Sequence, residues 1–137
     1  MPLRKRATGV VVKDGKVLLV RDKGRRSYSL PGSSTHRDEP AISAVARELY
    51  EETGLSADRV ERVMTYRGAT QEHAVFLISA HHGRLRLRGE LDGSMWWDGK
   101  ANVPTFDHVI GILKRLKITD GPVVERGGGH PEAKDAP

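Results

Sequence analysis

Three glutamates near the middle of the chain have the spacing of a metal-binding cluster. Glu48, Glu51 and Glu52 lie three and four residues apart along the chain, so on a helix their side chains project from one face. Like charges at positions i and i+4 repel each other, so the clustering costs stability unless a cation binds. Three carboxylates without cysteine or histidine suit a hard ion, Mg²⁺ or Mn²⁺, completed by water, a backbone carbonyl and phosphate oxygens. An ordinary charged helix surface is the alternative interpretation.

The distribution of charge along the chain points to the same kind of site. The 137 residues carry a formal charge of +5. Residues 1–37 hold ten basic and two acidic side chains, whereas residues 38–52 hold five acidic side chains against the single base Arg47. A basic block that runs into an acidic one suits a phosphorylated ligand bound through a divalent cation. Two solvated faces of opposite sign are the simpler explanation of charge alone.

The glutamates are predicted to lie on a helix over 40–53. Pro40 suits a first helical turn, and Gly54 suits the left-handed residue just past a helix end. Glu48 and Glu52 flank the apolar stripe of this helix, which places them near a sheet and not on the far solvent side. The stripe consists of Ile42, Val45, Ala46 and Leu49, which recur at helical spacing.

Strands are predicted on both sides of this helix. Segments 7–12 and 16–21 read as a hairpin with Asp14-Gly15 in its turn. Further strands are expected at 27–30, 60–66, 74–79, 85–87 and 95–97, with a polar irregular segment at 33–38 and a turn at 81–83. A second amphipathic helix is expected at 106–116. This order predicts an α+β fold, an α/β/α sandwich with a mixed β-sheet between helices.

The segment around the glutamates resembles the Nudix box. Glu39 is followed, after seven residues, by the run RELYEETGL at 47–55, which matches every fixed position of the box from Glu39 onward. Ser33 stands where the box has its first glycine, and Gly32 precedes it. The lead-in YSLPG at 28–32 and the run WWD at 96–98, followed by a helix, resemble the family's flanking segments. The resemblance spans roughly 7–117.

The resemblance implies a hydrolase that uses water to attack the pyrophosphate of a nucleoside diphosphate linked to another group. It implies one to three Mg²⁺ ions, with Mn²⁺ as a substitute, and Arg47 with Glu39 as a supporting ion pair. The implied metal ligands are the side chains of Glu48, Glu51 and Glu52 and the carbonyl of Gly32, with Glu90 as a further ligand. The general base stays open between a helix glutamate, Glu51 or Glu48, and a distant loop residue such as Glu90, which could equally be a solvated glutamate.

Ser33 departs from the pattern. A positive φ at Ser33 would keep the loop shape at a cost in strain, and any other angle would put the position of the Gly32 carbonyl in question.

Candidate substrate-binding residues surround this box. Arg25 and Arg26 could contact distal phosphates or form a solvated basic loop, while Asn102 and Asp107 could contact the edge of a base. Tyr28 and Trp96 could stack on a base, but adjacent tryptophans face opposite sides of a strand, so at most one of Trp96 and Trp97 should line the site. The histidines show no metal-ligand spacing and are expected at the surface.

The composition limits the remaining classes. The chain has no cysteine, which excludes disulfides, thiolate metal sites and cysteine nucleophiles and makes the cytoplasm the default location. No apolar stretch approaches the roughly 20 residues of a membrane span, and no signal peptide is recognisable.

We expect one domain over 1–119, a flexible tail over 120–137, and a monomer or homodimer. The expected partner is a nucleotide or nucleotide derivative and not a nucleic acid. The alternative function is a catalytically weak Nudix-fold module that binds nucleotides or RNA.

Overall fold

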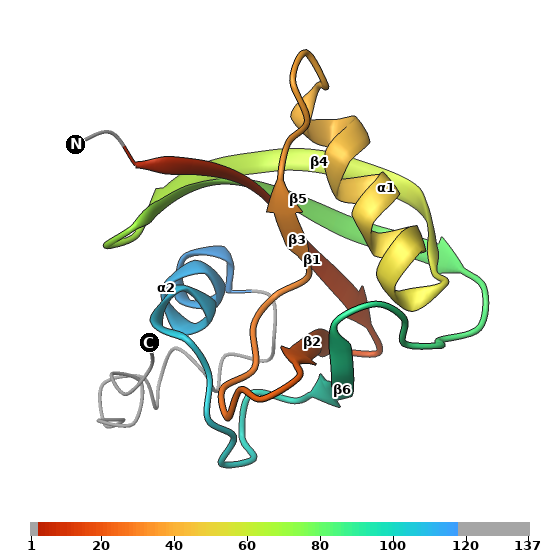
Figure 1. Ribbon diagram of the computed structural model, residues 1–137. Coiled ribbons are helices and arrows are strands. Elements are labelled where there is room, and N and C mark those ends of the chain that lie inside the picture. Colours follow the sequence, from red (N-terminus) through yellow and green to blue (C-terminus); the bar gives the residue numbers. More distant parts are fainter. Residues whose placement is uncertain (1–2, 118–137) are drawn as a thin grey trace.

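A mixed β-sheet lies between two helices in the computed structural model, which describes residues 3–117 (Figure 1). The elements are β1 (Arg4–Lys13), β2 (Lys16–Asp22), β3 (Gly32–Ser34), α1 (Ala41–Thr53), β4 (Ser56–Arg67), β5 (Gln71–His82), β6 (Leu91–Trp97) and α2 (Asp107–Leu116). The strands follow the order β4-β5-β1-β2-β6, and β3 pairs with β1. β1 runs parallel to β5, and the other pairs are antiparallel. This architecture confirms the predicted α+β sandwich.

The alternating side chains of β1 supply both hydrophobic cores. Ala7 and Val11 pack in the cluster that contains the buried face of α1, whereas Val10 packs in the cluster that contains α2. Successive side chains of a strand point to opposite faces, so one apolar strand buries residues against both helices. Thr8 lies on the same side of β1 as Val10, because the two residues are two positions apart in the strand. It bonds His73, whose ring stacks on His108 of α2.

A split between β1 and β2 positions the candidate site. The two strands pair only next to their turn, at Val12 with Val17 and at Lys13 with Lys16. Beyond that point β2 pairs with β6, while β3 takes the place beside residues 6–8 of β1. Figure 1 shows β3 in front of β1 and next to α1. The split therefore brings the 30–34 segment to the helix that carries the glutamates.

Several local strand and turn predictions were wrong. Residues 27–30 form only isolated bridges, Val20 with Ser29 and Tyr28 with Thr105. The segment expected to be irregular contributes β3, because its backbone completes the edge of β1 that β2 leaves. β5 continues through His82, which was expected to lie in a turn.

The segment 84–88 is not a strand, although its side chains alternate. Its amides bind the end of α1 instead: Arg86 N donates to Thr53 O (2.8 Å) and Arg88 N donates to Glu52 O (2.9 Å). The last carbonyls of a helix lack partners within the helix, so a neighbouring extended segment can satisfy them. The arrangement holds the C-terminal end of α1 in place.

Both helices begin one residue later than predicted. Pro40 and Phe106 are N-cap residues with extended backbone and not members of a first turn. Gly54 adopts the predicted left-handed conformation, with φ of 79°. The expected domain boundary at 119 and the tail 120–137 lie outside the described residues. Within residues 3–117 no helix has the length and apolar character needed to cross a membrane.

Candidate functional site

Arg47 gathers three carboxylates at one side of α1. Its Nε and Nη2 donate to Oε2 and Oε1 of Glu39 at 2.7 and 3.0 Å. Its Nη1 donates to Glu48 Oε2 (2.9 Å) and Glu51 Oε1 (3.1 Å). These hydrogen bonds from Arg47, followed by one from the His36 amide, lower the pKa of Glu39 to about 2. The predicted ion pair between Arg47 and Glu39 is thus present and ties α1 to the loop before it.

Glu52 and Glu48 form a second, self-repelling pair. Burial raises the pKa of Glu52 to about 7, and the charge of Glu48, a hydrogen bond with Glu48 and the charge of Asp22 add to the rise, while Arg6 opposes it. Without a cation, this pair therefore retains a proton near neutral pH. A bound divalent ion would remove the need for that proton.

The donor set fits a hard cation in its chemistry. The available ligands are carboxylate oxygens with excess negative charge, which suit Mg²⁺ or Mn²⁺. As the side chains stand, residues 3–117 contain no group of three acidic or histidine side chains that converges on one point. Arg47 binds one oxygen of Glu48 and one oxygen of Glu51. The second oxygen of each carboxylate receives no hydrogen bond from Arg47 and is available to a cation.

The start of β3 requires glycine at 32 and not at 33. Gly32 has φ of 149°, and a Cβ there would overlap the carbonyl oxygen of Ala7. Ser33 does not have a positive φ; it is an extended β3 residue paired with Ala7. Ser33 is therefore unstrained, and its hydroxyl donates to Ser34 O (3.2 Å). The backbone beside the Gly32 carbonyl is fixed by close approach to β1.

A polar cluster lies on the α2 side of the split. Arg6 Nε donates to Thr8 Oγ1 (3.1 Å), and Arg6 Nη2 donates to Leu30 O (2.7 Å). The Thr8 hydroxyl also bonds His73 Nδ1 (2.8 Å), and the His73 ring stacks on His108 with centroids 4.7 Å apart.

The two imidazoles of this cluster are neutral near pH 7. Burial, reinforced by the charge of Arg6, lowers the pKa of His73 to about 4 and that of His108 to about 3. The expectation of surface histidines is wrong for His73, which is 1% exposed. Nε2 of His108 is buried without a hydrogen-bond partner among the described residues.

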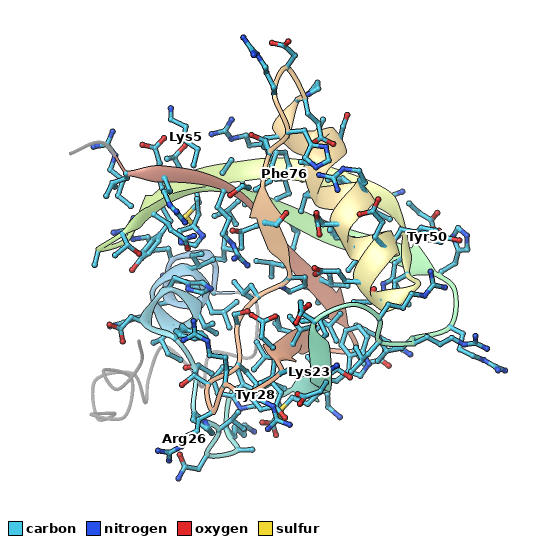
Figure 2. The ribbon with its side chains drawn as sticks, viewed as in Figure 1. Lys5, Lys23, Arg26, Tyr28, Tyr50 and Phe76 are labelled. Carbon is cyan, nitrogen blue, oxygen red and sulfur yellow. The ribbon has the colours of Figure 1, made fainter. Side chains whose placement is uncertain are left out.

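Some candidate substrate residues gather where the 25–29 segment meets the start of α2. Tyr28 N donates to Pro104 O (2.9 Å), and Phe106 N donates to Tyr28 O (3.0 Å). The guanidinium of Arg25 lies 5.8 Å from the centre of the Phe106 ring. Asp107, the first residue of α2, follows directly. Arg26 is exposed at the lower edge of the molecule in Figure 2, well away from α1.

Comparison with known proteins identifies the fold and the family. A family model described as the NUDIX domain matches residues 3–108. The chain belongs to the Nudix family. The box residues noted above therefore lie within a Nudix domain, on the helix and loop whose geometry is described here.

Individual Nudix relatives are moderately similar. A MutT-like protein of Streptomyces ambofaciens is 38% identical over 91 residues, which are 64% of this chain and 59% of that protein. An ADP-ribose pyrophosphatase of Methanocaldococcus jannaschii is 28% identical over 111 residues, 73% of this chain and 65% of that protein. The chain thus spans less than two thirds of the length of these curated relatives. The crystal structure of a MutT NUDIX hydrolase from Burkholderia pseudomallei has a TM-score of 0.77 at 22% identity, covering 85% of this chain and 99% of that one, and shows the shared fold.

Three other candidates lie elsewhere in the Nudix domain. Trp96 packs on the α1 side of the sheet, where it stacks on His81 at 5.7 Å, while Trp97 lies in the α2-side core. The prediction that the two rings face opposite sides is confirmed. Glu90 is exposed in the turn before β6, and its side chain makes no ion pair within residues 3–117. Asn102 is exposed in the loop before α2.

Sequence reasoning missed Arg6 and Asp22, whose charges act on Glu52. The sequence contains a pattern that predicts only one of these groups, the polar cluster of Arg6, Thr8 and His73 on the α2 side of the sheet. Alternation along β1 and β5 places Arg6, Thr8 and His73 on one face of neighbouring parallel strands, in register at Arg6 with His73. No local pattern marks Asp22, because it joins the site through the divergence of β2 from β1.

Proposed function

We propose that this Nudix domain hydrolyses a pyrophosphate bond in a nucleoside diphosphate derivative and requires Mg²⁺ or Mn²⁺. The observation that carries the proposal is the half-buried, self-repelling pair of Glu48 and Glu52. Burial and mutual repulsion hold the pKa of Glu52 at about 7, a cost that a structural helix has no reason to carry. A divalent ion would offset this repulsion.

The proposed role of four residues of the box is to bind the metal ions. Glu48, Glu51, Glu52 and the carbonyl of Gly32 would hold the metal. Metal ions bound there would neutralise phosphate charge and lower the pKa of a bound water.

Glu51 is the proposed general base. Its side chain is 56% exposed and receives a single hydrogen bond from Arg47, so it is free to accept a proton from water. Arg47 and Glu39 are positioning residues, because their paired hydrogen bonds fix the face of α1 that carries the ligands.

The proposed substrate class is a nucleotide with a diphosphate linkage. Support comes from the basic 1–37 segment, from Arg25 beside the start of α2, and from the M. jannaschii relative named for ADP-ribose. We place this activity in a domain within 1–119, acting as a monomer or homodimer in the cytoplasm, on the composition and the extent of the family match.

The deciding experiment is a substrate panel with and without Mg²⁺. Nucleoside triphosphates, ADP-ribose, nucleotide sugars and dinucleoside polyphosphates are incubated with the protein, and products are identified by chromatography. Hydrolysis should require Mg²⁺ and fall at least about 100-fold in Glu52→Gln, because a charged ligand is lost. Glu61→Gln on the exposed side of β4 is the control. Nucleotide binding without hydrolysis in the parent protein would instead support the binding-module alternative.

A further inference from the structure

Arg6 is a partly buried cation without an anionic partner. None of the ion pairs among residues 3–117 includes it. Both of its hydrogen bonds go to neutral oxygens, those of Thr8 and Leu30. They use two of the five N–H groups of a guanidinium and leave three without a partner among these residues. A partly buried guanidinium without a direct ion pair is only incompletely compensated for the water that it loses.

The position of Arg6 connects the two faces of the split. Its hydrogen bond to Leu30 O anchors the chain two residues before Gly32, and its Nε reaches the Thr8 and His73 pair on the α2 side. Burial lowers the pKa of Arg6, and the charges of Glu52, Asp22 and Glu48 oppose that fall. The guanidinium therefore lies within the electrostatic reach of the carboxylates proposed to hold metal.

Metal binding changes the charge balance around Arg6. While the carboxylates are free, their negative charge offsets the guanidinium. A divalent ion on Glu48 and Glu52 consumes that negative charge and adds a second positive centre nearby. Two cations in a partly buried space repel each other, so the metal-loaded site lacks an anion on the Arg6 side.

We propose that Arg6 binds a phosphate group of the substrate and thereby makes metal binding and substrate binding cooperative. The inference rests on the proposed function and adds a residue outside the Nudix box to it. Its geometry carries it, because Thr8 and Leu30 hold a guanidinium with unused donors next to the Thr8–His73 hydrogen bond. Phosphate oxygens match such donors with charge-assisted hydrogen bonds. The coupling is reciprocal, because each ligand must favour the other by the same factor.

The first test measures Mn²⁺ binding without nucleotide, by electron paramagnetic resonance of free Mn²⁺. Arg6→Gln should bind Mn²⁺ about threefold tighter or more, because a repelling charge is removed. Arg6→Met keeps the apolar part of the side chain and should show the same increase in Mn²⁺ affinity. It replaces Arg6→Gln in the experiment if the glutamine variant folds poorly. Arg4→Gln removes an equal charge from an exposed position on the same strand and should leave the Mn²⁺ affinity unchanged.

The second test measures binding of α,β-methylene adenosine diphosphate at saturating Mn²⁺ and in EDTA. Arg6→Gln should lose about tenfold or more in affinity at saturating Mn²⁺, and the gain in affinity that Mn²⁺ confers should shrink. Tighter metal and weaker nucleotide binding in one variant is a pattern that a purely structural arginine would not produce. Equal affinities for both ligands in wild type and both Arg6 variants would overturn the inference, whereas failure of the wild type to bind Mn²⁺ would overturn the proposed function itself.

Discussion

The guanidinium of Arg47 holds the carboxylate of Glu39 with two hydrogen bonds of 2.7 and 3.0 Å across eight residues of sequence. The remaining Nη1 reaches Glu48 and Glu51 on the same helix. The planar guanidinium of Arg47 therefore sets the positions of a loop carboxylate, that of Glu39, and of two proposed metal ligands, Glu48 and Glu51. Only arginine offers this geometry, because lysine presents a single point charge.

Replacing the Arg47 guanidinium should reduce the rate of hydrolysis more than the stability of the fold. Arg47→Lys keeps the charge but cannot bind Glu39 through two nitrogens while it contacts Glu48. We expect about a 10- to 100-fold loss of hydrolysis and a higher Mg²⁺ requirement, as for other residues that orient metal ligands. Initial rates over a Mg²⁺ titration test this, with Arg59→Lys on the exposed side of β4 as control. An unchanged Mg²⁺ dependence would contradict the positioning role.

Removing the charge of Glu52 should stabilise the metal-free fold in a pH-dependent way. The folded pKa of about 7 lies above the ordinary 4.5, so between these values the folded state holds more protons than the unfolded state. The stabilising contribution of Glu52 is therefore present below about pH 4.5 and lost as the pH rises through 7.

Glu52→Gln has no carboxylate to deprotonate, so its free energy of unfolding does not fall in this way as the pH rises. The excess of its unfolding free energy over that of the wild type should therefore be larger at pH 7.5 than at pH 5. Urea unfolding in EDTA measures the difference. Saturating Mg²⁺ should reverse it, because the wild type gains stability from a bound ion and the variant gains less. A variant that is less stable than the wild type at pH 7.5 in EDTA would contradict the repulsion between Glu48 and Glu52.

The buried imidazoles should make the protein sensitive to acid. His73 and His108 have pKa values of about 4 and 3, below the ordinary 6.5, so on acidification the unfolded chain takes up protons before the folded one. Their stabilising contribution is complete above about pH 6.5 and is lost as the pH falls towards 4. In His108→Gln the loss of unfolding free energy between pH 6.5 and 4 should be shallower. An unchanged slope in urea unfolding across that range would refute this prediction.

The glycine requirement at the start of β3 gives a matched pair of variants. Gly32→Ala places a Cβ against the Ala7 carbonyl at φ of 149°, and we expect it to cost about 3 kcal/mol or more of stability, together with most of the activity. Ser33→Gly touches an ordinary extended residue and should cost no more than about 1 kcal/mol. Thermal unfolding and hydrolysis rates of the two variants test whether glycine is required at 32 and not at 33. A smaller loss of stability and activity in Gly32→Ala than in Ser33→Gly would contradict this requirement.

The sequence allowed the helix that carries the glutamates to be predicted almost to the residue, because apolar spacing and Gly54 act locally. The pairing of Arg47 with Glu39 followed from the recognised spacing of the box. Arg6 and Asp22 could not be found in this way, because they approach Glu52 only where β1 and β2 diverge. That divergence depends on the competition of β3 and β2 for the edge of β1, a long-range outcome that no local pattern encodes.

The segment 84–88 resembles a strand in sequence for a physical reason. Alternating leucines bury one side against the α1-side core, yet the amides of Arg86 and Arg88 bind helix carbonyls and not a neighbouring strand. Alternation reports which side chains are buried; it does not identify the partner of the backbone.

The attachment of Arg86 and Arg88 to the end of α1 also determines where this chain can be lengthened. An insertion between them would separate two amides from Thr53 and Glu52 and loosen the end of the helix. The next residue, Gly89, has φ of 65° and open space around it. A loop inserted after Gly89 would therefore leave both contacts with the end of α1 intact, which makes this turn the tolerant position for lengthening the chain.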